Sequence, residues 1–113
     1  MRGITEDELG NIYFSYYSSI HVLNPRNGSL VPLFSEQLSY PYGILYERGH
    51  LYTGEGLRIN LRSQKMDTIV QDFSGAEGVV MKDKDGYIWF GCKNKLAYFD
   101  PVDQTTKQFS GEV

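Results

Sequence analysis

The stretch Gly86-Tyr87-Ile88-Trp89-Phe90 occurs in two earlier variants along the chain, and this repetition decides the fold. The variants are Gly10-Asn11-Ile12-Tyr13-Phe14 and Gly49-His50-Leu51-Tyr52-Thr53, so the three glycines are separated by 39 and 37 residues. A period near 38 residues is the length of one supersecondary unit, which cannot bury its own faces and stacks on its neighbours. The chain is therefore expected to be a repeat protein.

A second apolar run follows each copy of this stretch after a short gap. The runs are Ile20–Leu23, Leu57–Leu61 and Leu96–Phe99. The gap is shorter in the middle copy, where Glu55-Gly56 replaces the four residues that the other copies have. Because both apolar runs recur with the same period, the repeat extends well beyond its glycine motif.

Each copy contains four short segments of strand composition, rich in Val, Ile, Tyr and Phe and bounded by turn residues. The predicted strands are 3–6, 11–15, 20–23 and 30–34, then 44–46, 50–53, 57–61 and 68–72, then 79–82, 87–91, 96–99 and 107–109. Between the first two strands, Asp7–Gly10 and Asp83–Gly86 combine an acid that accepts backbone N–H bonds with a glycine for positive φ. No segment shows the periodic apolar face of a helix.

Four antiparallel strands in about 40 residues are the composition of a β-propeller blade. We therefore predict an all-β fold, a β-propeller segment of three four-stranded blades over residues 3–34, 43–72 and 78–109. Propellers close with about 4 to 8 blades. The sequence thus predicts either a piece of a longer propeller, with further blades in cis, or identical chains that complete a ring in trans.

Composition excludes several classes of protein. With 41% hydrophobic and 14% aromatic residues, the 113-residue chain has enough apolar material for one packed domain. A net charge of −3 and scattered basic residues argue against nucleic-acid binding. No apolar run approaches the roughly 20 residues of a membrane helix. The single cysteine, Cys92, excludes an internal disulfide and is expected to fill space near a strand.

The third copy resembles the two-component regulator propeller repeat, through its acidic turn, Ile88–Gly91 (Ile-Trp-Phe-Gly) and Leu96–Pro101 (Leu-x-x-Phe-Asp-Pro). Residues 3–34 match with Tyr13 in place of the tryptophan, and residues 43–70 match loosely because they lack the acidic turn and the proline. The resemblance implies a periplasmic sensor region of a bacterial hybrid two-component system, where propellers precede a membrane helix and a histidine kinase. It also implies sensing of oligosaccharides released from glycans by a segment that is not itself an enzyme.

Loops that connect the second and third strands of a blade emerge on the same side of a propeller as the loops between blades. Tyrosines there offer flat rings for sugar C–H faces and a hydroxyl for polar recognition. The candidate ligand-binding residues on this side are Tyr16, Tyr17, Tyr40, Tyr42, Glu55, Glu77, Lys93 and Asn94. The competing interpretation is that these tyrosines pack between blades or cover a sheet edge.

Two other functions remain open at this stage. A scaffold that docks a partner protein would use the same aromatic loops. A propeller lactonase or lyase would need carboxylates or histidines on the innermost strands, which carry only Glu6 and Lys82 at their ends. His21 and His50 lie in different copies without ligand spacing, so no metal, cofactor or catalytic residue is expected.

Overall fold

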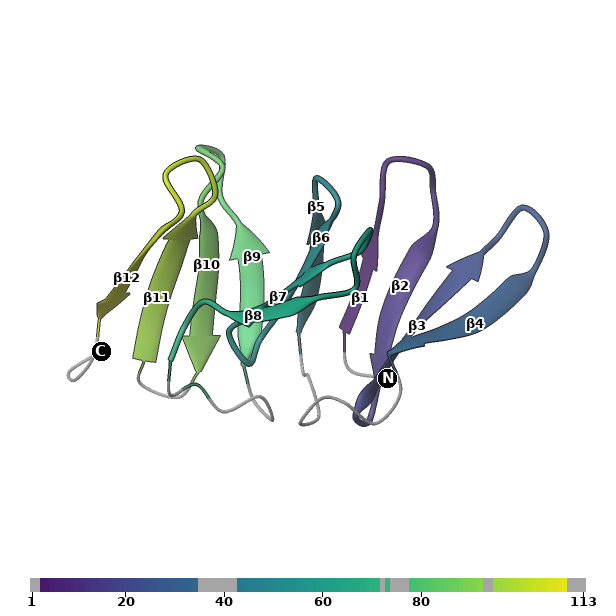
Figure 1. Cartoon of the computed structure of the whole chain (residues 1–113), viewed down its shortest axis with the longest axis horizontal. Helices are drawn as coiled ribbons and strands as arrows, with labels where there is room; N and C mark the ends of the chain where they lie inside the picture. The colour runs from purple at the N-terminus through teal and green to yellow at the C-terminus, as the bar shows by residue number, and fades with distance from the viewer. Residues whose placement is uncertain (1–2, 35–42, 72, 74–77, 93–94, 110–113) are drawn as a thin grey trace.

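The structure, a computed structural model, describes residues 3–34, 43–71, 73, 78–92 and 95–109. In these residues the chain forms twelve strands in three four-stranded antiparallel sheets, which confirms the predicted all-β architecture. Figure 1 shows the sheets side by side in chain order, from the first sheet on the right to the third on the left. Each sheet is called a blade below, numbered along the chain.

The strands of each blade pair in simple meander order. Blade 1 consists of β1 (Gly3–Glu6), β2 (Ile12–Tyr16), β3 (Ser19–Asn24) and β4 (Ser29–Phe34). Blade 2 consists of β5 (Ile44–Glu47), β6 (His50–Thr53), β7 (Leu57–Asn60) and β8 (Met66–Thr68). Blade 3 consists of β9 (Val79–Lys82), β10 (Ile88–Cys92), β11 (Lys95–Asp100) and β12 (Thr105–Phe109).

In blades 1 and 3, the aspartate of the turn before the second strand accepts hydrogen bonds both from the turn backbone and from the aromatic side chain of the following strand. The Asp7 carboxylate accepts the backbone N–H of Asn11 (2.9 Å) and the hydroxyl of Tyr13 (3.0 Å). The Asp83 carboxylate accepts the corresponding backbone N–H (3.0 Å) and the Nε1–H of Trp89 (2.7 Å). One carboxylate therefore caps the turn and also holds the aromatic ring of the next strand, which explains why the acid and the ring recur together.

Blade 2 has a shorter turn at this position, without the hydrogen-bonded aspartate. Arg48 and Gly49 alone connect β5 to β6, with φ angles of 47° and 83°. Two consecutive positive φ angles define the two-residue hairpin turn that matches the twist of the flanking strands. The missing acid of the middle copy thus reflects a different turn type within the same blade.

The turn after the third strand uses an Asn or Asp side chain in all three blades. Asn24, Asn60 and Asp100 each accept, through the side-chain oxygen, the backbone N–H two residues further on (3.0, 2.9 and 2.9 Å). This local bond pre-forms the turn. Although blade 2 lacks the proline of the other two, Asn60 alone produces the same turn.

The fourth strand of blade 2 begins earlier than predicted. It spans Met66–Thr68, whereas the sequence pattern predicted 68–72, and that prediction was wrong. The turn closes quickly because the N–H of Asn60 donates to the carbonyl of Lys65 (2.9 Å), so pairing starts at the next residue. After the strand, two consecutive N–H groups donate to the carbonyl of Gly56 (2.8 and 3.1 Å), which draws the chain out of the ladder.

The hydrophobic core consists of two layers, one between each pair of successive blades. Below, the forward face of a blade is the face toward the next blade in the chain, and the rear face is the opposite one. The first layer buries Tyr13, Ile20, Phe34, Ile44, Leu51 and Ile59. The second layer buries Tyr52, Val70, Ile88, Phe90, Ala97 and Phe99. Cys92, also buried, fills space at the end of β10 as expected.

The inner ends of blades 2 and 3 approach each other through backbone alone. A Cβ atom built on Gly78 would lie 2.0 Å from the carbonyl oxygen of Gly54, and one built on Gly54 would lie 2.1 Å from the carbonyl oxygen of Gly78. The Gly78 carbonyl also accepts the N–H of Gly43 (3.0 Å). Because ordinary side chains have no room here, these glycines set the distance between the two blades.

Candidate functional site

The predicted ligand face is represented among the described residues by three of its eight members. Tyr16 and Tyr17 lie at the β2–β3 turn with 49% and 59% of their surfaces exposed. Their rings meet edge to face with centroids 4.6 Å apart, and Tyr17 has a φ of 55°. Glu55 lies half-buried in the β6–β7 loop of the next blade. The two tyrosines therefore form one exposed aromatic pair.

The other five candidates, Tyr40, Tyr42, Glu77, Lys93 and Asn94, lie outside the described residues. A binding site composed of all eight side chains stays a prediction. The described part of this face contributes an aromatic pair on blade 1 and a carboxylate on blade 2.

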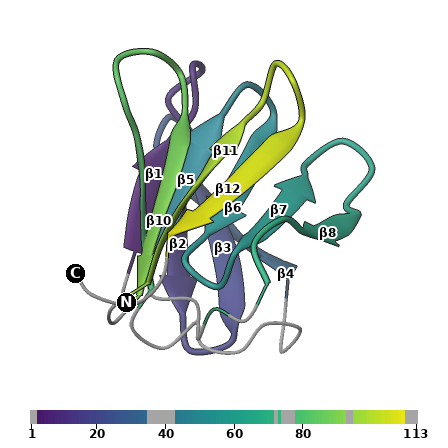
Figure 2. The same cartoon turned by 90° about the vertical axis from the view of Figure 1, so that its left-hand side faces the viewer.

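A cavity of about 320 Å³ lies at the opposite end of the blades. It opens where the β5–β6 turn of blade 2 meets the β9–β10 and β11–β12 hairpins of blade 3, and Figure 1 shows these hairpins at the end away from the β2–β3 turn. Its lining consists of Glu47, Arg48, His50, Tyr52, Arg58, Asp85, Gly86, Asp100, Pro101, Val102 and Gln104. Figure 2 views the molecule from the side of blade 3.

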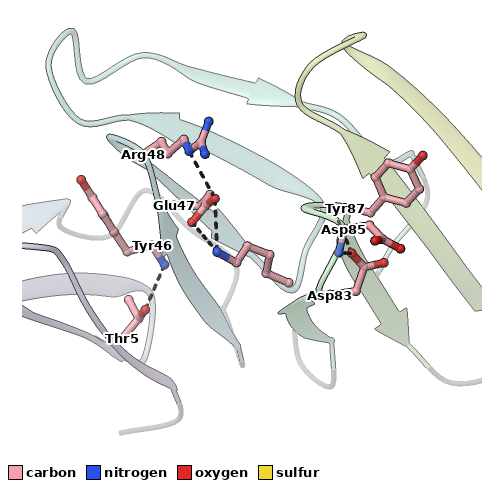
Figure 3. Close-up of polar contacts among 8 residues, drawn as sticks. Thr5, Tyr46, Glu47, Arg48, Asp83, Asp85 and Tyr87 are labelled. Atoms are coloured by element: carbon pink, nitrogen blue, oxygen red, sulfur yellow. Dashed lines mark hydrogen bonds and ion pairs between the residues drawn. The ribbon is translucent and has the colours of Figure 1, made fainter.

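The carboxylate of Glu47 links the two blades at the edge of this cavity. Its Oε1 accepts a hydrogen bond from Nζ of Lys82 at the end of β9 (3.2 Å), and the two charged groups form an ion pair. Its Oε2 lies 3.8 Å from Nε of Arg48. Figure 3 shows Glu47 and Arg48 on blade 2, with Asp83 and Asp85 on blade 3 across from them. The Arg48 side chain is 90% exposed, so it is the most accessible cation of the lining.

Arg58 forms the floor of the cavity and is held from three sides. Its guanidinium donates to Oε1 of Gln104 (2.8 Å) and to the carboxylate of Asp67 (3.1 Å), and it lies 5.2 Å from the centre of the Phe99 ring. Burial raises the pKa of the neighbouring Tyr52 hydroxyl, and the positive charge of Arg58 offsets part of that effect. Arg58 is thus a fixed cation between the blades.

Carboxylates line the blade 3 side. The Asp100 carboxylate accepts the backbone N–H of Val102 (2.9 Å), and its negative charge raises the pKa of the Tyr87 hydroxyl. Asp85 lies exposed on the adjacent hairpin. With cations on blade 2 and carboxylates on blade 3, the cavity offers hydrogen-bond donors and acceptors to a small polar molecule.

Within the described ranges, no three His, Cys, Asp or Glu side chains gather in a way that would hold a metal ion. His21 stacks on Phe14 with centroids 5.5 Å apart, and His50 contacts the carbonyl of Arg48 (3.3 Å). The two histidines lie on different blades, as the sequence indicated. None of the described segments forms a helix with the length and apolar character needed to cross a bilayer.

The sequence did not predict this cavity, because many of its lining residues lie in turns whose polar side chains already have a structural role in the repeat. The acid of the β9–β10 turn and the Asn or Asp after the third strand have evident capping roles. The one available signal was Arg58, a charged residue in the third strand of blade 2 where blades 1 and 3 have Val22 and Tyr98.

No protein-family model and no curated protein matches the chain. Solved structures of similar fold include proteins from Bacteroides thetaiotaomicron. One is the extracellular domain of BT3049, assigned to the hybrid two-component systems, with a TM-score of 0.74 at 22% identity over 92% of this chain. The extracellular domain of BT4673, assigned as a one-component system, has a TM-score of 0.71 at 17% identity over 98% of this chain.

A third similar structure, an auxiliary nutrient binding protein from the same organism, has a TM-score of 0.59 at 15% identity over 96% of this chain. The chain spans 16%, 18% and 35% of the lengths of the three proteins. At these identities the similarity concerns the fold. At that level, the resemblance to the propellers of two-component sensors is confirmed.

Proposed function

We propose that this chain is a non-catalytic propeller segment of the extracytoplasmic sensor domain of a hybrid two-component signalling protein. The observation that carries the proposal is the stack of three blades, whose fold neighbours are extracellular domains assigned to one- and two-component systems. A histidine kinase then lies elsewhere in the full-length protein, and the propeller lies in the periplasm. Cell fractionation tests the location: the chain is expected in the fraction that contains a periplasmic marker protein and is expected to be absent from the cytoplasmic fraction.

The ligand that we propose is an oligosaccharide derived from a glycan. Support comes from the exposed pair Tyr16 and Tyr17 at the β2–β3 turn, which presents an aromatic platform beside polar hydroxyls. A nutrient binding protein among the fold neighbours agrees with a ligand of this class. Sugar rings stack on such platforms through their C–H faces while the hydroxyls hydrogen-bond at the rim.

The test is a panel of oligosaccharides screened by the shift in melting temperature, followed by calorimetric titration of any hit. A variant with Tyr16→Ala and Tyr17→Ala is expected to lose the shift. Arg48→Ala is the matched control, because it changes an exposed residue of the cavity at the other end of the blades. If the shift in melting temperature persisted in the tyrosine variant and disappeared in Arg48→Ala, the ligand would bind in the cavity instead. If no glycan produced a shift, oligosaccharide sensing would be refuted.

A further inference from the structure

The cavity between blades 2 and 3 lies where one hydrogen bond of the repeat is not made. In blade 1 the hydroxyl of Tyr13 donates to the turn carboxylate of Asp7 (3.0 Å). In blade 3 the Nε1–H of Trp89 donates to the turn carboxylate of Asp83 (2.7 Å). Tyr52 is the corresponding ring of blade 2, because it also lies three residues after the glycine of its turn. Its ring is buried in the core, and the residue lines the cavity.

The acid at the corresponding position of blade 2 is Glu47, and it bonds to the neighbouring blade instead. By register Glu47 lies opposite His50, which is the position of the turn aspartates in the other blades. Its carboxylate accepts a hydrogen bond from Lys82 of blade 3 (3.2 Å; Figure 3). Burial raises the pKa of the Tyr52 hydroxyl, and the positive charge of Arg58 lowers it. Tyr52 therefore has a cation beside its hydroxyl where its counterparts have a bonded carboxylate.

Two sequence differences open the space beside Tyr52. Between blades 1 and 2, the ring of Tyr46 stacks on Tyr13 with centroids 5.9 Å apart. In blade 3 the position of Tyr46 is occupied by Lys82, which pairs with the second strand at the corresponding rung of the ladder. The β5–β6 turn is also shorter than the β1–β2 turn. The second interface thus lacks both a ring and a longer turn at the place where the cavity lies.

The polar groups of the cavity are separated by charge. Blade 2 contributes the guanidinium groups of Arg48 and Arg58, whose planar N–H groups match a carboxylate. The nearest approach of Arg48 to Glu47 is 3.8 Å, longer than a hydrogen bond, so this exposed cation keeps its donors for another group. Blade 3 contributes the carboxylates of Asp85 and Asp100, which accept hydrogen bonds. The volume of about 320 Å³ lies at the lower end of the roughly 300–1,000 Å³ that small-molecule sites occupy.

We propose that this cavity binds a small organic acid, whose carboxylate lies beside Tyr52 and the two arginines while its other end donates hydrogen bonds to Asp85 and Asp100. The ligand carboxylate then supplies the acceptor that the turn aspartates supply in the other blades. A sugar acid carries suitable donors as hydroxyls, and an amino acid carries them as an ammonium group. Both are of a size that agrees with the cavity.

The site is distinct from the aromatic pair of the proposed oligosaccharide site. Tyr16 and Tyr17 lie at the β2–β3 turn, at the opposite end of the blades. All residues that line the cavity come from two successive blades of one chain, so the site does not depend on what covers the ends of the stack. The two proposals can therefore fail separately.

The test is calorimetric titration of the protein with D-glucuronate, D-glucose and L-serine at millimolar concentration. Glucose keeps the sugar ring but has no carboxylate, so it is expected to bind at least about 10-fold more weakly than glucuronate. L-Serine keeps the carboxylate and replaces the ring hydroxyls by an ammonium group and one hydroxyl. Comparison of glucuronate with serine therefore shows whether the natural ligand belongs to the sugar acids or to the amino acids.

Two variants locate the bound carboxylate. Tyr52→Phe removes the hydroxyl but keeps the buried ring, and Arg48→Gln removes the charge of a side chain that is 90% exposed, so circular dichroism should show that both keep their fold. Each is expected to weaken binding of the acid about 10-fold. Arg62→Gln is the matched control, because Arg62 is an exposed arginine of the β7–β8 turn outside the lining.

The Tyr16→Ala and Tyr17→Ala variant should also keep the wild-type affinity for the acid, which separates this site from the proposed oligosaccharide site. Binding of glucuronate, or of serine alone, supports the proposal when Tyr52→Phe and Arg48→Gln weaken it. Equal affinity for glucose and glucuronate, an affinity for the acid that is unchanged in both variants, or no binding of either acid would each overturn the proposal.

Discussion

Substitution Gly78→Ala tests the backbone contact that joins blades 2 and 3. The new Cβ would lie 2.0 Å from the carbonyl oxygen of Gly54, and ordinary contact begins near 3.4 Å, so the blades must separate by about 1.4 Å at this point. Overpacking of this kind costs about 1–3 kcal/mol. The separation also strains the bond from Gly43 N–H to the Gly78 carbonyl (3.0 Å), and the loss of such a bond costs about 1 kcal/mol.

The expected loss is thus about 2–4 kcal/mol in the free energy of unfolding, or about 8–16 °C in melting temperature for a chain of this size. Thermal and urea unfolding followed by circular dichroism measure it. Gly91→Ala is the matched control, because its Cβ would lie 3.5 Å from the Val79 side chain, at ordinary contact distance. That variant should change stability by less than about 0.5 kcal/mol. If Gly78→Ala also stayed within that margin, the close approach of the two backbones would be refuted.

Three further substitutions test the turns. In Asp83→Asn, the free energy of unfolding should fall less steeply as the pH is lowered. Hydrogen bonds from Trp89 and the turn amides lower the pKa of Asp83 in the folded state, so the stability that this carboxylate contributes is complete above pH 3.8 and is lost as the pH falls through the lower folded value. Equal pH profiles for both proteins would contradict this role. Trp89→Phe keeps the ring but removes the Nε1–H donor to Asp83, and a lower melting temperature at pH 7 is expected by calorimetry. Gln64→Gly should raise stability by up to about 1 kcal/mol in urea unfolding, because φ is 61° at Gln64 and the corresponding residue of blade 1 is already glycine, Gly28 at 75°; a destabilised variant would show that the side chain outweighs the backbone strain.

The blade pattern was predictable because it is written in local chemistry. The acidic turn with its aromatic partner, the Asn or Asp after the third strand and the alternating apolar runs each act within a few residues. Local rules failed at β8, where the pattern predicted 68–72 and the strand is Met66–Thr68. The bond from Asn60 N–H to the Lys65 carbonyl sets where the strand begins, and the carbonyl of Gly56, which lies beyond the reach of a turn motif, draws the chain out of the ladder after Thr68.

The candidate sites divide in the same way. Tyr16 and Tyr17 were predicted as ligand-binding residues; the structure places them in one exposed pair at the β2–β3 turn, and their role in binding stays a prediction. The cavity between blades 2 and 3 was not predicted, because it exists only where Arg58 of one blade meets Gln104 of the next.

The sequence alone determined the number of blades, their strand content and most of the turn chemistry, since these follow from residues that interact along one segment. Only the tertiary structure decided which face of each blade is forward and which is rear. Both faces of a blade are apolar, so composition cannot tell them apart. The packing of Tyr13 on blade 2 and of Tyr52 on blade 3 orients the whole stack, and thereby shows that Trp89 and Ile12 lie on opposite end faces.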